Sequence, residues 1–288
     1  MLMRVLLMLL AAVVVRGSDS RAEDLNCLTD AERAGSDLYA HLQQEAYEAL
    51  DRRAEAYEKL KTPEQIKAYQ QRMRLFMTKQ LGGFPARSPL NAKTVRTIQA
   101  DGYRIENVIF DSQPNHRITA NLYLPETDGQ VPGVGVSSGH SRTGKTADYN
   151  QRFGIMMAKH GMAALCFDPI GQGERSQILT AEGQPQHNGT TTEHFLIGVG
   201  STLVGRNTAR YRVWDAMRAI DYMVSRPEID ATKIGFTGCS GGGTLTSYVM
   251  ALDDRVACAA PACYLTTFRK LIETIGPQDA EQNIFGQV

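Results

Sequence analysis

The sequence predicts an α/β fold: a mostly parallel sheet with helices on both faces, preceded by an N-terminal helical arm. Short apolar runs alternate with helical segments from about residue 94 onward, which is the pattern of strands joined by crossover helices. Two β-rich runs, 103–110 and 116–123, precede that alternation with a turn between them, so we expect an antiparallel hairpin first. Residues 29–81 carry helical periodicity instead.

The arm, residues 23–93, is expected to be a structural appendage packed on the main domain. Leu38, Leu42 and Leu50 recur at helical spacing with charged residues between them, which predicts a first helix. Thr62 is a suitable N-cap and is followed by a proline at the first helical position, so a second helix should begin there.

Residues 1–22 have the features of a secretory signal peptide. Arg4 is followed by an apolar run, 5–15, and small residues precede a possible cleavage site after Ala22. A membrane-spanning helix needs ~20 apolar residues, so this run favours cleavage over an uncleaved anchor, the alternative interpretation. We therefore expect a secreted or periplasmic protein without a stable membrane span after cleavage.

Charge and composition exclude several classes of protein. Lysine and arginine number 31, aspartate and glutamate also number 31, and 42% of residues are hydrophobic. A balanced charge gives no electrostatic basis for binding nucleic acid, and the composition is that of an ordinary globular protein. The length allows one large domain or two small ones, and the oligomeric state is left open.

The main domain, 94–288, should continue with alternating elements. Further strands are expected at 131–138, 162–167, 233–237 and 256–264, and helices at 148–160, 207–226 and 243–252. Residues 174–206 show no clear period, so we expect an irregular insertion there, of a length that is usually functional.

The run from Gly238 to Gly242 lies between a predicted strand and a predicted helix. A serine hydroxyl becomes an effective nucleophile when a sharp strand-to-helix turn lifts it out of the sheet. Ser240 occupies the centre of this run, and Gly238 and Gly242 would leave space for the crossing backbones. We predict that Ser240 is a catalytic nucleophile; the alternative is a structural glycine-rich turn. Cys239 should point back into the fold.

Two loops are candidates for holding an oxyanion. The amide of Gly241, at the start of the following helix, should be one donor, and the loop after strand 131–138 should supply the other. Ser141 is our choice in that loop, with His140 close behind; a plain loop is the alternative. The same loop formally matches a phosphate-binding pattern ending at Lys145 and Thr146, but a hairpin precedes it, so no nucleotide cofactor is predicted.

Cysteine and histidine spacing gives no metal site. The five cysteines, an odd number, lack the spacing of zinc ligands, and we expect free buried thiols, with a bridge between Cys258 and Cys263 left open. The histidines are scattered along the chain, so no metal is predicted. The loop 168–175, after a strand, is expected to be a tight structural turn rather than a source of catalytic groups.

Three segments together resemble a known family. The runs 238–244, 213–222 and 168–175 resemble those of acetylxylan esterase-like α/β-hydrolases, whose neighbours are the glucuronoyl esterases and the dienelactone hydrolases. The similarity covers most of residues 80–288. It implies an α/β-hydrolase fold and a serine hydrolase that cleaves carboxylic esters, such as acetyl groups on plant polysaccharide. A peptidase of the prolyl-oligopeptidase type is a lesser alternative.

The sequence departs from that family in one respect. The family's chain order is serine, acid, histidine, yet no histidine follows Ser240 in this sequence. Asp279 and Glu281 are candidates for the acid. Three explanations remain open: the chain stops before the catalytic acid and histidine, leaving the sheet incomplete; an upstream histidine supplies the base; or the protein binds a ligand without turnover. The upstream candidates are His140, His187 and His194.

Overall fold

A computed structural model describes residues 27–34, 37–274 and 279–287, which fall into two compact units, 1–46 and 47–288. The predicted signal peptide lies outside the described residues. Among the residues that are described, no helix combines the length and the apolar character needed to cross a membrane. The boundary at residue 93 stays a prediction.

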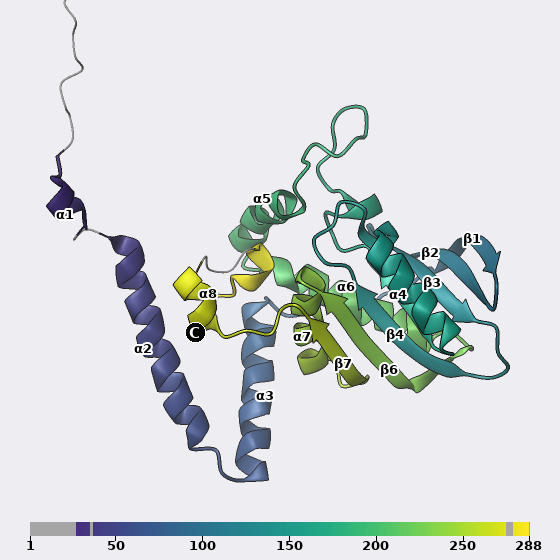
Figure 1. The fold of residues 1–288 in the computed structure, drawn as a ribbon, viewed down its shortest axis with the longest axis horizontal. Helices are drawn as coiled ribbons and strands as arrows, with labels where there is room; N and C mark the ends of the chain where they lie inside the picture. The colour runs from purple at the N-terminus through teal and green to yellow at the C-terminus, as the bar shows by residue number, and fades with distance from the viewer. Residues whose placement is uncertain (1–26, 35–36, 275–278, 288) are drawn as a thin grey trace, which may run out of the picture. The chain divides into compact units, whose positions relative to one another are not determined.

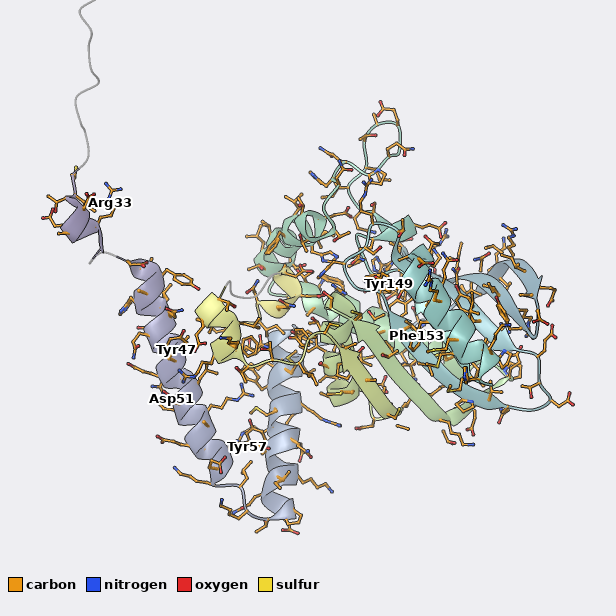
Figure 2. All side chains as sticks on the ribbon, in the orientation of Figure 1. Arg33, Tyr47, Asp51, Tyr57, Tyr149 and Phe153 are labelled. Carbon is orange, nitrogen blue, oxygen red and sulfur yellow. The ribbon has the colours of Figure 1, made fainter. Side chains whose placement is uncertain are left out.

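Helices are present within 29–81, where the sequence predicts them, and the arm as a separate domain stays a prediction. The first unit holds α1 (Asp30–Ala34) and the beginning of α2 (Leu38–Glu58), which continues into the second unit. Helix α3 (Pro63–Gln80) begins at Thr62, whose hydroxyl accepts from the Gln65 amide in a capping box, as the sequence predicts. Within the second unit, Arg269 pairs with Asp51 and lies over the ring of Tyr47, both on α2 (Figure 2).

A seven-stranded mixed sheet forms the centre of the second unit, in the order β1-β2-β3-β5-β4-β6-β7. Its strands are β1 (Lys93–Ala100), β2 (Tyr103–Gln113), β3 (His116–Pro125), β4 (Val131–Ser137), β5 (Ala163–Phe167), β6 (Ile229–Cys239) and β7 (Val256–Ala262). The first three strands and the β3–β5 pair are antiparallel, and β5, β4, β6 and β7 are parallel. Strand β1 was not predicted, because its mostly exposed residues show no apolar alternation.

Helices cover both faces of the sheet, as predicted (Figure 1). On one face α4 (Asp148–Lys159) packs against β3 and β5, where Tyr123 and Cys166 are buried. On the other face α6 (Thr208–Val224) and α7 (Gly241–Leu252) close the larger core around Phe236 and Ile220. The carboxyl ends of β4, β5 and β6 therefore meet in loops at one end of the sheet.

The expected irregular insertion contains a helix, which corrects the prediction for 174–206. Helix α5 (Thr190–Leu203) forms there although four threonines and two glycines lower its intrinsic helix propensity. Tertiary contacts explain it, because Glu193, His194 and Ser201 on α5 are buried against the domain. The remaining short elements are η1 (Gly144–Thr146), η2 (Gly173–Arg175), α8 (Phe268–Thr274) and η3 (Ala280–Gln282).

The cysteines are free, as expected, but most of them are not buried. Cys166 is the buried thiol, Cys239 is half-buried, and Cys27, Cys258 and Cys263 are exposed. The prediction of buried thiols is wrong for Cys258 and Cys263 because they lie on and just beyond β7, the edge strand of the sheet.

Candidate active site

Ser240 lies at the junction of β6 and α7 in a strained backbone conformation. Its φ is 56° and its ψ is −119°, a region that residues with a side chain rarely adopt. The Ser240 amide donates to the Ala262 carbonyl at 3.0 Å, and its own carbonyl accepts from the Thr244 amide at 3.0 Å. The turn therefore holds the serine outward between strand and helix, and its side chain is exposed.

The two flanking glycines sit where no side chain fits. A Cβ on Gly238 would come within 2.5 Å of the Ser137 carbonyl oxygen and within 2.6 Å of the Gly242 backbone. A Cβ on Gly242 would come within 2.1 Å of the same Ser137 oxygen. The end of β4 thus crosses the turn directly, and the crowding is what the sequence pattern predicts.

The loop that follows β4 passes beside the nucleophile position. The Cβ position of Gly139 lies 3.6 Å from the Ser240 Cβ and 2.5 Å from the Cys239 carbonyl oxygen. Gln172 holds this loop, because its amide nitrogen donates to the Gly139 carbonyl at 2.7 Å and to the Ser141 carbonyl at 3.0 Å. The loop is therefore fixed at both sides of His140.

Tyr149 of α4 adds a phenol to the same loop (Figure 2). Burial raises the pKa of Tyr149, as does the nearby Cys239 thiol, while hydrogen bonds with the Ser141 side chain and the Gly139 backbone act in the opposite direction. The phenol therefore keeps its proton at neutral pH. It can donate a hydrogen bond beside the loop without acting as a base.

His140 lies over the start of α7. A Cβ on Gly241 would come within 2.6 Å of the His140 ring at Cε1, so the imidazole covers the residue next to the nucleophile. The ring donates from Nε2 to the Asp279 carboxylate at 2.5 Å, and its side chain is 19% exposed. A carboxylate on one ring nitrogen fixes the tautomer and leaves Nδ1 available on the other side.

His194, from α5, contacts the same carboxylate of Asp279 as His140 does, and it is buried. Its Nδ1 lies 2.7 Å from the same Asp279 oxygen, and its Nε2 lies 2.7 Å from the Ile170 carbonyl oxygen. Acceptor oxygens therefore face both ring nitrogens, which holds the His194 ring between Asp279 and the backbone at Ile170. His194 and Asp279 are each fully buried.

Charged side chains of both signs surround Asp279. Arg212 of α6 pairs with Glu281 and places a guanidinium nitrogen 3.8 Å from the Asp279 carboxylate. Burial acts to raise the pKa of Asp279, but the hydrogen bonds from His140 and His194 outweigh it and hold this pKa below its usual range. Burial raises the pKa of Glu281, which Arg212 only partly offsets.

The same groups are the ones that could hold a metal ion. Ligand atoms of His140, His194 and Asp279 lie within 4.8 Å of one another, and His194 donates its other nitrogen to a backbone carbonyl, as metal-bound histidines do. The two imidazoles instead hydrogen-bond the carboxylate directly, and Arg212 already supplies positive charge. The hydrogen bonds account for this donor set without a cation.

A second buried cluster lies under the neighbouring loops. The Nζ of Lys145 lies 2.6 Å from Asp168, and the Lys145 amide donates to the same carboxylate at 2.7 Å. A Cβ on Gly144 would come within 2.0 Å of that carboxylate. The glycine-lysine pair therefore packs around the carboxylate of Asp168.

Arg175 links this cluster to α6. Its guanidinium donates to the Asp168 carbonyl at 2.8 Å and lies 2.7 Å from Asp215. Burial acts to raise the pKa of Asp215, but Arg175, His116 and Ser112 outweigh it and lower this pKa to about 2. The loop 168–175 thus has the structural role expected of it.

Comparison with known proteins assigns the fold to a family. Residues 56–286 match the model of the acetyl xylan esterase family, which is most of the chain. The chain belongs to the acetyl xylan esterase family. YtaP of Bacillus subtilis, named as a hydrolase, is 26% identical over 205 residues, which are 67% of this chain and 64% of that protein.

Solved structures agree on the α/β-hydrolase fold of this acetyl xylan esterase family member. A Bacteroides fragilis protein classed as an acetyl xylan esterase aligns with a TM-score of 0.64 at 17% identity, covering 78% of this chain and 63% of that one. Methylesterase BT1017 aligns with a TM-score of 0.57 at 23% identity, covering 74% and 45%. The chain thus spans less than two thirds of the length of these relatives.

The structure brings some of the predicted site residues together, and it shows further residues at the site that were not predicted. Ser240, Gly241, Gly238 and Gly242 form the turn, and Ser141 lies in the adjoining loop, where its hydroxyl contacts Thr143 at 3.1 Å. His187 lies in the loop before α5, and no hydrogen bond or ion pair joins it to Ser240 or Asp279 among the described residues. The residues that sequence reasoning missed are Gln172, Tyr149 and Arg212, for which no local signal exists.

Proposed function

We propose that this chain is the core of a serine hydrolase that cleaves carboxylic esters, with Ser240 as the nucleophile. The observation that carries the proposal is the backbone of Ser240, which is strained at φ 56° where β6 meets α7. A non-glycine residue persists in such a conformation when the surrounding structure imposes it, and this most often occurs at functional sites. Family membership supports the same chemistry.

The oxyanion would be held by backbone amides. Gly241 is the first residue of α7, so its amide has no partner within the helix and lies at the positive end of the helix dipole. In a trans peptide the N–H points opposite to the C=O, and the Gly139 carbonyl accepts a hydrogen bond from the Gln172 side-chain amide. The His140 amide therefore points away from Gln172, which favours it over the expected Ser141 amide as the second donor.

His140 is the imidazole best placed to serve as the base in this chain. Asp279 orients it through Nε2, and its Nδ1 has no partner among the described residues. In the proposed step, Ser240 Oγ attacks the ester carbonyl carbon while its proton moves to His140 Nδ1. The same proton then leaves with the alcohol, and water repeats the sequence to release the acid.

The proposed substrates are acetyl or related small esters on plant polysaccharide, met outside the cytoplasm. Support for the ester class comes from the family description and from the name of the methylesterase whose fold this chain shares. Support for export comes from the sequence of residues 1–22. The exposed Ser240 side chain suits a substrate that is part of a polymer.

Acetate release from acetylated xylo-oligosaccharides by the full chain tests the proposal, with Ser240→Ala compared against Ser247→Ala. Ser247 lies on the same helix, where its hydroxyl donates to the Gly243 carbonyl at 3.0 Å. We expect Ser240→Ala to lower kcat/KM by at least ~10³-fold, because the nucleophile is lost. Ser247→Ala should keep the rate within a few fold. Equal rates for wild type and Ser240→Ala would reject the nucleophile.

A further inference from the structure

Two thiols flank the nucleophile turn. Cys239 is the last residue of β6 and directly precedes Ser240, and Cys263 directly follows the last residue of β7. The parallel register pairs Cys239 with Ala262, and the Ser240 amide donates to the Ala262 carbonyl at 3.0 Å. The two cysteines therefore sit at adjoining strand ends, one residue apart in register.

Their backbone separation suits a covalent bridge. Neighbouring strands lie about 4.8 Å apart and each residue rises about 3.3 Å, so a one-residue offset gives a Cα–Cα distance of about 6 Å. Disulfides span Cα–Cα distances of roughly 4.4–6.8 Å. Cys258 lies too far from Cys263 for a disulfide. It is on the same extended strand, about 13 Å before Ala262, the residue that precedes Cys263. The bridge between Cys258 and Cys263 that the sequence left open is thus ruled out by geometry.

The backbone at Cys263 directs the two side chains toward each other. In a continuing strand, the Cys263 side chain would point to the sheet face opposite that of Ala262, and so away from Cys239. Cys263 instead has a φ of 56°, which is unusual for a residue with a side chain and turns the chain at this point. The Cys263 side chain also acts on Cys239, whose pKa it raises, in keeping with two neighbouring thiols.

The two cysteines differ in their surroundings, which make Cys239 the poorer nucleophile. Burial raises the pKa of Cys239, and the Cys263 thiol raises it further. The Cys239 thiol therefore keeps its proton at neutral pH, so Cys239 does not compete with Ser240 as a nucleophile. Cys263 is exposed and can meet a reagent from solution, whereas Cys239 is half-buried beside it.

We propose that Cys239 and Cys263 form a disulfide that joins the ends of β6 and β7 beside the nucleophile. A small-molecule disulfide is the oxidant: the Cys263 thiolate attacks one of its sulfurs and releases one thiol. Cys239 then attacks the mixed disulfide and releases the second thiol, which completes a two-electron oxidation. Each released thiolate takes up one of the protons that the two cysteines lose.

The bridge would close a loop that contains α7 and β7. It would tie the strand end that carries Ser240 to its neighbour, so the turn would stay anchored when β7, an edge strand, opens. Oxidised glutathione is the probe for the test, applied to the native full chain before denaturation, alkylation and peptide mass mapping without reduction. The readout is a covalent bond and is independent of ester hydrolysis.

We expect one cross-linked peptide pair that joins Cys239 to Cys263, with the free thiol count falling from five to three, that is by two. Cys263→Ser should remove the cross-link, and the matched variant Cys258→Ser should keep it. A glutathione adduct on Cys263 without the cross-link would overturn the proposal. So would a bridge to Cys258, or alkylation of Cys239 and Cys258 to equal extents after oxidation.

Discussion

Two buried charge clusters lie near the carboxyl ends of the central strands, and they differ in what they leave unpaired. The first consists of two buried ion pairs, Lys145 with Asp168 and Arg175 with Asp215. The second centres on Asp279, where one carboxylate oxygen serves both His140 and His194. Only the second cluster extends a partly exposed ring to the nucleophile turn.

We infer from this difference that the first cluster stabilises the fold and that the second takes part in proton transfer. A cluster whose members are all paired and buried fixes loops in place, and breaking it exposes an uncompensated charge. A cluster that leaves one imidazole nitrogen without a partner among the described residues, as His140 does, keeps a group ready to exchange a proton. We therefore expect mutations in the first cluster to change stability and mutations at His140 to change turnover.

The largest stability effect should come from Asp215→Asn. This change leaves Arg175 buried without its carboxylate partner, so the free energy of unfolding should fall by about 3–5 kcal/mol. Urea unfolding followed by circular dichroism measures it. Asp148→Asn is the matched control, because its pair with Arg152 is exposed, and we expect a change below about 1 kcal/mol. Similar losses for both variants would contradict the structural role.

At His140 the effect should fall on rate. His140→Gln keeps a donor toward Asp279 but removes the base, so kcat should drop by about 10²-fold or more, with a smaller change in unfolding free energy. His160→Gln, at the exposed end of α4, should leave kcat unchanged. The pH dependence of kcat with an acetyl ester measures both. A full rate for His140→Gln would place the base elsewhere and would leave the nucleophile assignment intact.

A smaller effect should appear in acid. Asp215 has a folded pKa of about 2 against an unfolded value of ~3.9, so its contribution to stability is complete above ~3.9 and is lost as the pH falls toward 2. The lowered pKa of Asp279 acts in the same direction. Unfolding free energies measured between pH 5 and 2.5 should decline by about 2 kcal/mol more in wild type than in Asp215→Asn. Parallel declines would refute the linkage.

Features that depend on residues close together in the chain were predicted correctly from the sequence. The capping box at Thr62, the helix at 208–224 and the turn at Ser240 depend on neighbours within a few residues, and each is found where the sequence predicts it. The α/β fold follows from the same alternation of short strands and helices.

Long-range contacts account for what was missed. Asp279 meets His140 and His194 across 139 and 85 residues of chain, and no pattern in the sequence relates those positions. Helix α5 forms because tertiary contacts bury one face of it, which outweighs its poor propensity. The proximity of Cys239 and Cys263 depends on strand order and on one unusual turn. Each case needs the sheet to be assembled before the neighbours are known.

The strain at Ser240 also gives a way to separate the stability of the fold from the proposed reaction. A side chain at φ 56° and ψ −119° costs on the order of 1–3 kcal/mol, which a glycine there would largely avoid. Ser240→Gly should therefore be inactive and yet more resistant to urea than wild type. Such a substitution removes the hydroxyl and relieves the strain together. Loss of acetate release with a gain in stability would mean that the strained backbone serves the proposed reaction and not the stability of the fold.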